Sequence, residues 1–563
     1  MAENKRKQQS FEYGAIILLC STVLVKIIGA IFKIPLGNEK LLGDLGFGYF
    51  SSAYDLFLPV YTLAMAGLPI AISRVVAEKM VQGRYKDVRK SLKVTSRIFI
   101  ATGLAATVIM LILIKPFVSL TDSTGKTVYS ILAIVPSLFF CCVMSTYRGY
   151  FEGLRNMYPT AVSDIIEALG KLILGLSFAY IVLKLTNNVA FAAAGAMAGI
   201  TVGGAAAAAF LYLRYKIKGD GITKQELAES PAAESSRAIA KTLIVIAIPI
   251  VLTSLANSIT SLVDVTMVKW QLNRIMQDSS QVIRDMYATS IADYNRFSAE
   301  ALTNAELPTF LYGIRGKAFT IYNLIPTITS VLGVSALPVL ASAWTKKDKQ
   351  LIKRNIESPI KFTALISMPA GFGFLFMGDE IMGLIYNTTA SHEIGGIMLR
   401  IYGLAAMFAG LAIPMTSMLQ SIGKEKVSLR NVAIGAVLKV IVNFIFVGIP
   451  SVNIQGAAIG TFVSYLFIFV MNLLSIIRYT GVKPNIYKTI VKPFAAALCC
   501  GLSTLIFDLS RMGRVGTIIE IAIAALVYVV VLILINAFEP EDILSLPKGE
   551  KLLSVLKKAK IIR

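Results

Sequence analysis

Apolar runs of about 20 residues recur along almost the whole chain, and this is the length of a helix that crosses a bilayer. Inside lipid, backbone N–H and C=O groups must be satisfied internally, so only helices and closed β-barrels span membranes. A barrel would show short alternating strands instead. The chain is therefore predicted to be an all-α polytopic membrane protein with about fourteen transmembrane helices. Their centres lie near Val23, Leu63, Ala106, Phe139, Leu174, Gly203, Leu252, Thr329, Ala370, Phe408, Ala436, Leu466, Ala497 and Val527.

An internal repeat divides these helices into two sets. Residues 58–62 (Leu-Pro-Val-Tyr-Thr) return as 325–329 (Ile-Pro-Thr-Ile-Thr), and residues 67–73 return as 336–342. The offset of roughly 260 to 270 residues is far longer than a solenoid period, so each copy is half of a transporter. Each copy holds an even number of predicted helices, about six, which makes the copies parallel lobes. Paired lobes around a central site suit alternating access.

The repeat and the polar stretches between helices set the predicted domain boundaries. They are a first lobe at 13–215, a cytoplasmic linker at 216–238, a second lobe at 239–480, two additional helices at 487–538 and a basic cytoplasmic tail at 539–563. The two additional helices have no counterpart in the first half of the chain.

The net charge of +22 would suit a nucleic-acid-binding protein, but the distribution of Lys and Arg does not. With a cytoplasmic N-terminus, about three quarters of the Lys and Arg outside the helices fall on the cytoplasmic side, as the positive-inside rule expects. We therefore expect both termini in the cytoplasm. The basic side chains are expected to contact anionic membrane lipids, and no nucleic-acid partner is expected.

Cysteine and histidine give no sign of a metal centre. All five cysteines lie inside apolar runs, and the single histidine, His392, is predicted in a short outer loop. This pattern indicates packing residues, with no disulfide framework and no metal site. One histidine does not assemble a convincing Ser-His-Asp or Cys-His set, and no ATP-hydrolysis motif is present. We expect no enzyme activity and no cofactor, with a gradient or the membrane potential as the energy source.

Ionisable residues inside a bilayer cost roughly 2.5 to 3.5 kcal/mol each on insertion scales, so each needs a reason. The candidate cavity cations are Lys26, Lys33, Arg315, Lys317 and Arg74. Lys26 lies too deep in the first helix for easy snorkelling, so it either lines a central cavity or pairs with a carboxylate such as Asp55. Lys33, Arg315 and Lys317 lie nearer the outer ends of helices. The topology rule alone accounts for Arg74 at the cytoplasmic end of the second helix.

A second group of charges is predicted to pair within the lobes. Its members are Asp55, Glu152, Asp164, Glu167, Lys171 and Lys439. Asp164, Glu167 and Lys171 share about one face of the fifth helix. Lys439 is the repeat mate of Lys171, and matched lysines near mid-span suggest structural staples. The alternative, a coupling-ion or proton site in the second lobe, would use Asp264, Asn443 and Thr461.

Proline and glycine occupy matching positions in the second and eighth helices. The predicted hinge residues are Pro59, Gly67, Pro69, Pro326 and Pro338. Proline removes an internal hydrogen bond and kinks or breaks a helix, which membranes tolerate where the freed backbone lines a cavity or is buried. These residues are candidate bending points, with ordinary kinked packing as the alternative.

Several segments resemble bacterial polysaccharide-biosynthesis flippases. They are residues 46–50 (Gly-Phe-Gly-Tyr-Phe), 68–74 (Leu-Pro-Ile-Ala-Ile-Ser-Arg), 148–154 (Arg-Gly-Tyr-Phe-Glu-Gly-Leu) and 159–163 (Pro-Thr-Ala-Val-Ser). The chain is most similar to the stage V sporulation protein B and Gram-positive lipid II flippase group. This group belongs to the multidrug/oligosaccharidyl-lipid/polysaccharide exporter superfamily. The resemblance covers almost the whole chain.

The resemblance implies a V-shaped pair of lobes in the bacterial plasma membrane that moves an undecaprenyl-diphosphate-linked saccharide, such as lipid II, to the outer leaflet. It implies a cationic cavity for the diphosphate, which Lys26 and Lys33, and less closely Arg315 and Lys317, would match. The Gram-negative members carry an Arg-Asp pair in the first helix, where Phe32 and Lys33 stand here. The last two helices would hold the lipid tail. Expected partners are the lipid-linked oligosaccharide, membrane lipids and cell-wall synthesis proteins, and we expect a monomer.

Other functions compete with this one. A flippase for another polysaccharide or for a sporulation-specific precursor would present the same diphosphate. A multidrug or cation antiporter of the same superfamily would need a carboxylate in one lobe. A membrane-embedded glycosyltransferase or polymerase would use the outer-loop residues Asp278, Asp285 and Asp293, and a non-transporting assembly scaffold would need no cavity cations.

Overall fold

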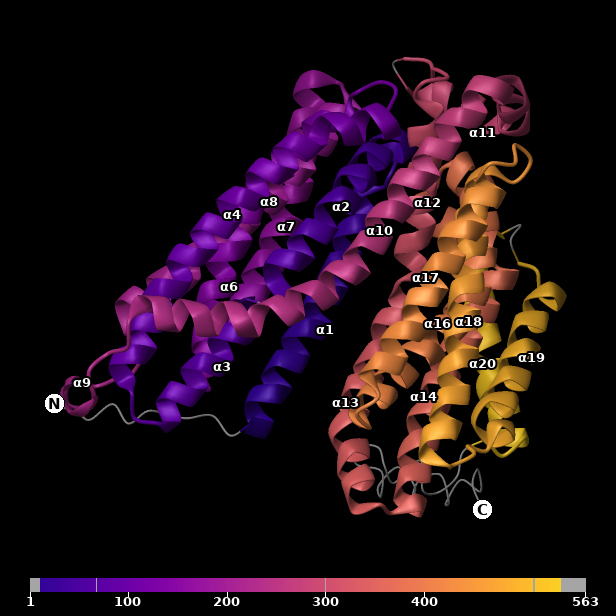
Figure 1. Ribbon diagram of the computed structural model, residues 1–563. Helices are drawn as coiled ribbons and strands as arrows, with labels where there is room; N and C mark the ends of the chain where they lie inside the picture. The colour runs from indigo at the N-terminus through magenta and orange to yellow at the C-terminus, as the bar shows by residue number, and fades with distance from the viewer. Residues whose placement is uncertain (1–10, 67, 299, 510–511, 538–563) are drawn as a thin grey trace. The chain divides into compact units, whose positions relative to one another are not determined.

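The computed structural model describes residues 11–66, 68–298, 300–509 and 512–537. Within these residues the regular structure is helical, and no strand is present. Contacts divide the chain into two compact units (Figure 1). The first unit comprises Met1–Asp278 and Leu302–Gly316, and the second comprises Ser279–Ala301 and Lys317–Arg563.

The first unit is built from α1 (Phe11–Leu36), α2 (Gly43–Ala66), α3 (Leu68–Val81), α4 (Tyr85–Thr121), α5 (Thr127–Ile134), α6 (Ser137–Gly153), α7 (Tyr158–Thr186), α8 (Val189–Lys218), α9 (Lys224–Glu229), most of α10 (Ser236–Met286) and the start of α12 (Leu307–Tyr322). The second unit contains α11 (Ala288–Phe297), α13 (Leu324–Lys346), α14 (Lys349–Phe376), α15 (Gly378–Tyr386), η1 (Ser391–Gly395), α16 (Gly396–Ser421), α17 (Glu425–Val447), η2 (Asn453–Gln455), α18 (Gly456–Thr480), η3 (Tyr487–Val491), α19 (Lys492–Ile506) and α20 (Gly513–Leu534).

The helices account for the predicted membrane spans. Among the described residues, ten helical stretches are long and apolar enough to cross a membrane. The remaining predicted spans correspond to α1, to α2 with α3, to α10 and to α12 with α13. The prediction of an all-α polytopic membrane protein with about fourteen transmembrane helices is therefore confirmed.

The boundaries of the two units differ from the lobe boundaries that the internal repeat predicts. The first unit also takes in the predicted linker, most of α10 and the start of α12, all of which follow the predicted end of the first lobe. The repeat describes internal symmetry, whereas the units describe packing. The lobe boundaries at 215 and 239 therefore stay a prediction.

Glycine residues let α7 and α8 approach each other closely. A Cβ atom at Gly199 of α8 would overlap the backbone of Gly175 in α7, and one at Gly203 would crowd the backbone at Gly170 and Lys171. Membrane helices associate through such close packing because lipid supplies no hydrophobic drive between them. The contact fixes α7, which carries several charged residues, against its neighbour.

An apolar core fills one end of the first unit. It joins Ile72 of α3, Val88 of α4 and Phe151 of α6 with Ile222 of the predicted linker and Ile239 of α10. Buried apolar side chains from so many elements hold the helix ends and the connecting segment together. In Figure 1 this end carries the labels α3 and α9.

The additional helices α19 and α20 pack on the second unit. Ala497 of α19 belongs to the same apolar core as Phe372 of α14 and Met407 of α16. Tyr528 of α20 donates a hydrogen bond of 2.9 Å to the carbonyl oxygen of Leu365 in α14. These helices are therefore an integral part of that unit.

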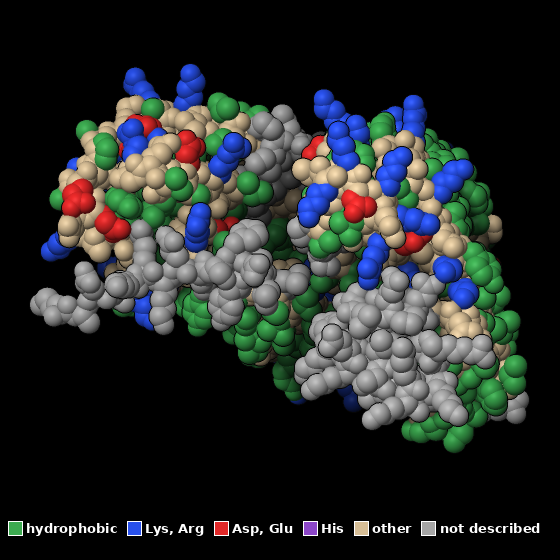
Figure 2. Space-filling view, turned by 90° about the horizontal axis from the view of Figure 1, so that it is seen from below, with side chains coloured by type: hydrophobic (Ala, Val, Ile, Leu, Met, Phe, Trp, Pro, Cys, Tyr) green, Lys and Arg blue, Asp and Glu red, His purple; other side chains and the backbone are tan. Residues whose placement is uncertain are grey.

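Lys and Arg side chains gather on one face of each unit. Figure 2 shows this face, with basic side chains projecting from both units and fewer acidic ones among them. In the first unit, Lys79 of α3 and Arg89 of α4 contact residues of the predicted linker at this end. Such a gathering is what the positive-inside rule expects of a cytoplasmic face.

Candidate functional site

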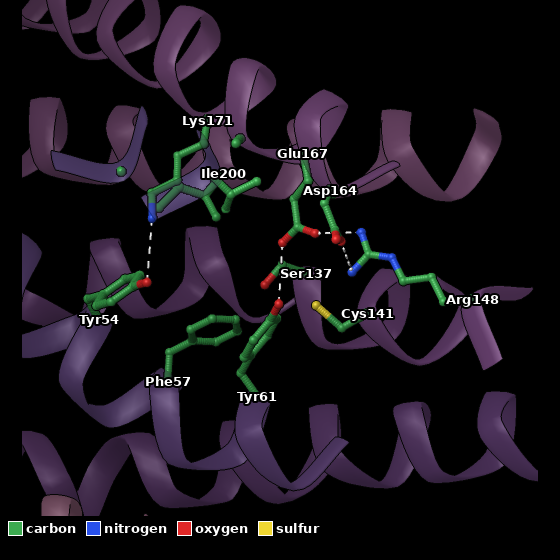
Figure 3. A pocket seen from close by; sticks show the side chains of 14 residues that line it. Tyr54, Phe57, Tyr61, Ser137, Cys141, Arg148, Asp164, Glu167, Lys171 and Ile200 are labelled. Carbon is green, nitrogen blue, oxygen red and sulfur yellow. Dashed lines mark hydrogen bonds and ion pairs between the residues drawn. The ribbon is translucent and has the colours of Figure 1, made fainter. Parts of the chain in front are cut away.

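A cavity of about 210 Å³ opens inside the first unit (Figure 3). Helices α1, α2, α6, α7 and α8 supply its walls. Its polar lining residues are Tyr54, Tyr61, Ser137, Arg148, Asp164, Glu167 and Lys171. The cavity therefore combines both signs of charge with aromatic hydroxyl groups.

Two carboxylates and one arginine form the acidic part of the cavity. Arg148 is 5% exposed. Its Nη1 lies 3.0 Å from an Asp164 oxygen, and its Nη2 lies 2.9 Å from a Glu167 oxygen. Its Nε donates a hydrogen bond of 2.9 Å to the Ser163 hydroxyl, and Tyr61 donates one of 3.4 Å to Glu167. A buried arginine needs this compensation, because an unpaired buried charge is costly.

A lysine and aromatic rings form the other part of the cavity. The Lys171 ammonium lies 4.8 Å from the centre of the Tyr54 ring and 5.3 Å from that of Phe32. It also donates a hydrogen bond of 3.4 Å to the Tyr54 hydroxyl. The Lys33 ammonium lies 4.9 Å from the centre of the same Tyr54 ring. Aromatic faces attract cations, so both lysines contact the same tyrosine.

Helical spacing explains how α7 supplies most of these charges. Asp164, Glu167 and Lys171 are separated by three and four residues, which places them on one face of the helix. All three line the cavity. The predicted shared face is thus what the structure has, and Lys171 contacts Tyr54 there. The predicted role of these residues as intra-lobe charges stays a prediction.

Two important residues of the cavity were not among the predicted site residues. Arg148 stands near the end of the apolar run centred on Phe139, and its charge inside that run was an available signal. Tyr54 lies one residue before Asp55, in a segment rich in aromatic residues. No spacing rule distinguishes a tyrosine that receives lysines from one that packs in a core, so Tyr54 left no comparable signal.

The predicted cavity cations of α1 lie near this cavity to different degrees. Lys33 is half-buried and contacts the cavity residue Tyr54. Lys26 is exposed, and the residues Val25 and Gly29 beside it on α1 line the cavity. Arg74 lies on α3 and is also exposed. Their predicted role in binding a substrate stays a prediction.

Arg315 lies in a separate buried cluster of the first unit. It is 4% exposed, with its guanidinium 3.3 Å from Asp264 and 3.8 Å from Asp55. Tyr312 donates a hydrogen bond of 2.7 Å to Asp55 and presents its ring 4.9 Å from Arg315. Asp55 is thus a partner of Arg315.

The first unit also contains the buried Lys269, which is another residue that the predictions omitted. It donates hydrogen bonds to Ser52 at 2.8 Å and to Thr309 at 3.3 Å.

Lys317 belongs to the second unit and is fully buried there. It donates a hydrogen bond of 3.3 Å to Ser391 and lies 5.0 Å from the centre of the Tyr386 ring. The Ser391 hydroxyl in turn accepts a hydrogen bond of 2.7 Å from Thr388. Lys317 is therefore part of the packing of α12 within this unit.

The residues predicted for ion coupling fall in different units. Asp264 belongs to the first unit, where it contacts Arg315. Asn443 of α17 and Thr461 of α18 are both buried in the second unit. Thr461 donates a hydrogen bond of 2.9 Å to the Ala457 carbonyl. The coupling role of this set stays a prediction.

The remaining predicted residues occupy the following places. Glu152 is half-buried in α6 and Lys439 is half-buried in α17. Pro59 is buried in α2, Pro69 lies in α3, Pro326 is buried in α13 and Pro338 lies in α13. Gly67 lies outside the described residues, between α2 and α3. Within the parts of the chain that the structure describes, no group of His, Cys, Asp and Glu has an arrangement suited to a metal ion.

Solved structures share this fold. The structure entitled lipid II flippase MurJ, inward closed conformation, superposes with a TM-score of 0.63 at 15% identity, covering 92% of this chain and 98% of that one. An inward-facing multidrug resistance MATE family transporter superposes with a TM-score of 0.62, also at 15% identity, covering 83% of this chain and 98% of that one. The chain therefore has the fold of these membrane transporters.

Sequence comparison gives relatives and a family. Stage V sporulation protein B of Bacillus subtilis (strain 168) is 24% identical over 547 residues, which cover 96% of this chain and 98% of the relative. Lipid II flippase MurJ of the same organism is 24% identical over 491 residues, covering 85% and 84%. A MatE family model matches residues 314–445, and the model described as polysaccharide biosynthesis protein matches residues 13–344. This multi-pass membrane protein thus belongs to the polysaccharide biosynthesis protein family.

Proposed function

We propose that this protein is a flippase. It moves an undecaprenyl-diphosphate-linked saccharide, in the first instance lipid II, from the inner to the outer leaflet of the bacterial plasma membrane. The polar head crosses by alternating access while the prenyl tail stays in lipid, so the protein acts as a carrier and not as an enzyme. Bending at Pro59, Gly67, Pro69, Pro326 and Pro338 accompanies the change of state.

The pair of lysines at Tyr54 carries this proposal. The ammonium groups of Lys33 and Lys171 both lie within 5 Å of the centre of one ring. A diphosphate offers several anionic oxygens to cations gathered at one aromatic residue, and charge-assisted hydrogen bonds to them are strong. The exposed Lys26 on the same helix as Lys33 extends the positive potential along α1. The two relatives described above, one named as a stage V sporulation protein and the other as a lipid II flippase, support this proposal.

The additional helices suit the lipid tail of such a substrate. Ile506 of α19 is 76% exposed, and Leu526 and Leu534 of α20 are 65% and 72% exposed. These apolar side chains meet acyl chains when the helices cross the bilayer. A prenyl chain is equally apolar, so we place the tail against this surface.

Transport into asymmetric proteoliposomes tests the proposal. A fluorescent undecaprenyl-diphosphate disaccharide is placed in one leaflet, and its appearance in the other is measured by quenching. Lys33→Gln and Lys171→Gln each remove a cation from the Tyr54 pair, and we expect about a tenfold loss of rate, since a hydrogen bond to a charged group contributes roughly 1.5 to 3 kcal/mol. Lys184→Gln is the matched control, because Lys184 is exposed on the same helix and contacts Tyr180 at 5.4 Å instead. Equal rates for all three variants would contradict the proposal.

A multidrug or cation antiporter is the second candidate, and Asp164 and Glu167 in the cavity favour it. Such a carrier binds a cation through a carboxylate, so an essential acid inside one lobe is its minimum requirement. The same proteoliposomes distinguish the two functions when a cationic dye and an imposed proton gradient replace the lipid. Dye movement that depends on Asp164 and Glu167, without lipid movement, would establish the antiporter.

A further inference from the structure

Residues 219–235, hereafter the strap, form a folded segment that is docked on the first unit. The sequence predicts only a polar linker here. The strap contains helix α9, whose first turn carries a capping box between Thr223 and Glu226. Ile222 of the strap is 6% exposed and belongs to the apolar core of the unit. Local capping and burial of this kind indicate a defined conformation.

Asp220 is the main anchor at the start of the strap. Its side chain is 2% exposed. It accepts hydrogen bonds from Arg89 Nε at 2.8 Å and Arg89 Nη2 at 3.0 Å, which is a bidentate pair. It also accepts the Tyr150 hydroxyl at 3.1 Å and the Ile222 backbone N–H at 3.0 Å. Bidentate arginine–carboxylate pairs combine strength with a fixed geometry.

Ser230 and Glu234 anchor the other end of the strap. The Lys86 backbone N–H donates a hydrogen bond of 3.1 Å to the Ser230 hydroxyl, and the Lys86 ammonium donates one of 2.8 Å to the Ser230 carbonyl. The Glu234 carboxylate lies 2.5 Å from Lys79 and 3.2 Å from Arg84. Because α10 begins at Ser236, the connection reaches that helix with almost no slack.

Helix α6 links the strap to the cavity. Tyr150, the hydrogen-bond donor to Asp220, lies two residues after Arg148 on α6 and is fully buried. On another side of α6, a Cβ at Gly149 would overlap Ile72 and the Pro69 carbonyl of α3, so the two helices are in close contact. Close packing on one side and a directed hydrogen bond on another determine how far α6 is rotated about its axis.

We propose that the strap is a positioning element for the cavity, in which Asp220 acts through Tyr150 to hold α6 in the rotation that places Arg148 between Asp164 and Glu167. The Arg148 guanidinium lies 3.0 Å from Asp164 and 2.9 Å from Glu167. Two ion pairs at these distances tolerate little rotation of the helix that carries Arg148. Asp220 and Tyr150 are thus positioning residues, and Arg148 is the group that they position. The transport arm of the test rests on the proposed function, whereas the exchange and stability arms do not.

Two variants separate the parts of this arrangement. Asp220→Asn weakens the bond to Arg89 and the anchoring of the strap. Tyr150→Phe removes only the hydroxyl that reaches Asp220 and leaves the Arg89 pair in place. Glu229→Gln is the matched control, because Glu229 is an exposed carboxylate of α9 that accepts a hydrogen bond from Gln225 within the strap. All are measured in the full-length protein in nanodiscs.

Amide hydrogen exchange provides the first readout. We expect exchange at 219–235 to accelerate about tenfold in Asp220→Asn, since a lost hydrogen bond to a charged group corresponds to at least that factor. In Tyr150→Phe we expect faster exchange at 145–153 with slow exchange retained in the strap. Glu229→Gln should match the wild type in both regions. Unchanged exchange of α6 in Tyr150→Phe would overturn the proposal.

A double-mutant cycle of Tyr150→Phe with Arg148→Gln measures the coupling between the two residues. A strap that only stabilises the fold predicts no such coupling. If Tyr150 acts through Arg148, the shift in melting temperature caused by Tyr150→Phe should largely disappear in the Arg148→Gln background. Additive shifts would overturn the proposal, because independent sites add. In the transport assay, Tyr150→Phe should slow lipid movement about threefold while Glu229→Gln does not. Absence of lipid transport by the wild type would contradict the proposed function alone, and the exchange and melting results would still decide the role of the strap.

Discussion

The Lys171 ammonium sits 4.8 Å from the centre of the Tyr54 ring while Lys33 sits 4.9 Å from the same point. Two like charges repel, and the repulsion is strongest where little water screens it. The quadrupole of one aromatic ring offsets part of that repulsion. Tyr54 is therefore the residue that both cations share, and we expect its ring to favour their presence in one folded unit.

Substituting Tyr54 separates the role of its ring from that of its hydroxyl. Tyr54→Phe keeps the ring, so the lysines should stay in place and the affinity for a diphosphate lipid should change less than about threefold. Tyr54→Leu removes the ring, and we expect about tenfold weaker binding, since each cation–π contact contributes roughly 0.5 to 2 kcal/mol. Titration of a fluorescent diphosphate lipid into nanodiscs measures both. Identical affinities for the two variants would argue against a role for the ring.

Acidification should release the strap through Asp220. Burial acts to raise the pKa of Asp220, but hydrogen bonds from Arg89, the Ile222 N–H and Tyr150 outweigh it and hold the pKa below the ordinary value of 3.8. A carboxyl whose folded pKa is depressed stabilises the fold above its unfolded pKa, and this stabilisation is lost as pH falls through the folded value. The strap should therefore stay docked from neutral pH to about pH 5 and weaken below 3.8.

Melting temperatures measured between neutral pH and about pH 3 check this expectation. Asp220→Asn should be less stable than the wild type at neutral pH and should lose less stability on acidification, because it lacks the titrating group. Glu229→Gln should follow the wild-type curve. Parallel curves for the wild type and Asp220→Asn would show that another group controls the acid sensitivity.

Asp122 should be important for stability at the opposite end of the first unit. Its side chain accepts hydrogen bonds from the backbone N–H of Thr124 at 3.0 Å and of Thr127 at 2.8 Å, and also from both threonine hydroxyls. Asp122→Ala leaves these donors without their acceptor, and we expect a loss of about 2 to 3 kcal/mol in the free energy of unfolding. Ser123 in the same turn is exposed, so Ser123→Ala should lower the free energy of unfolding by less than about 0.5 kcal/mol. Denaturant unfolding in detergent compares the two.

Two glycines of α8 should respond in opposite ways to the same substitution. Gly199→Ala places a methyl group against the Gly175 backbone, so α7 and α8 must separate, at a cost of about 1 to 3 kcal/mol. A Cβ atom at Gly204 would meet no atom closer than 4.0 Å, so Gly204→Ala should leave the stability of the protein unchanged or raise it. Thermal unfolding of the two variants gives the comparison. Equal destabilisation would show that helix flexibility, and not close contact, explains these glycines.

Sequence patterns predict the helices of this protein much better than the contacts between them. Apolar runs are sufficient for the all-α membrane fold, because lipid leaves a chain few other structures. The spacing of Asp164, Glu167 and Lys171 likewise predicts a shared helix face, since that face depends only on the period of one helix. The partner of each residue depends on how neighbouring helices are rotated, so no sequence pattern singles out Tyr54 or pairs Arg148 with Asp164 and Glu167.

Arg315 and Lys317 illustrate the same limit. They are two residues apart, which turns their side chains roughly 200° away from each other on a helix of 3.6 residues per turn. Sequence analysis groups them as cations of one vestibule. In the structure Arg315 contacts Asp55 and Asp264 of the first unit, and Lys317 contacts Ser391 of the second. Their positions in the sequence do not reveal that Arg315 packs in the first unit and Lys317 in the second.

The anchoring of residues 219–235 has a consequence for how this chain can vary and be engineered. A segment between two repeats is ordinarily where length drifts freely and where tags are inserted. Here Asp220 and Ile222 are held by directed contacts, so an insertion between them would displace an ionic anchor from its partner. Residues 231–233 are exposed and are the natural place for added length. The spacing from the end of α8 to Ile222 is therefore constrained much as the spacing of residues within a helix is.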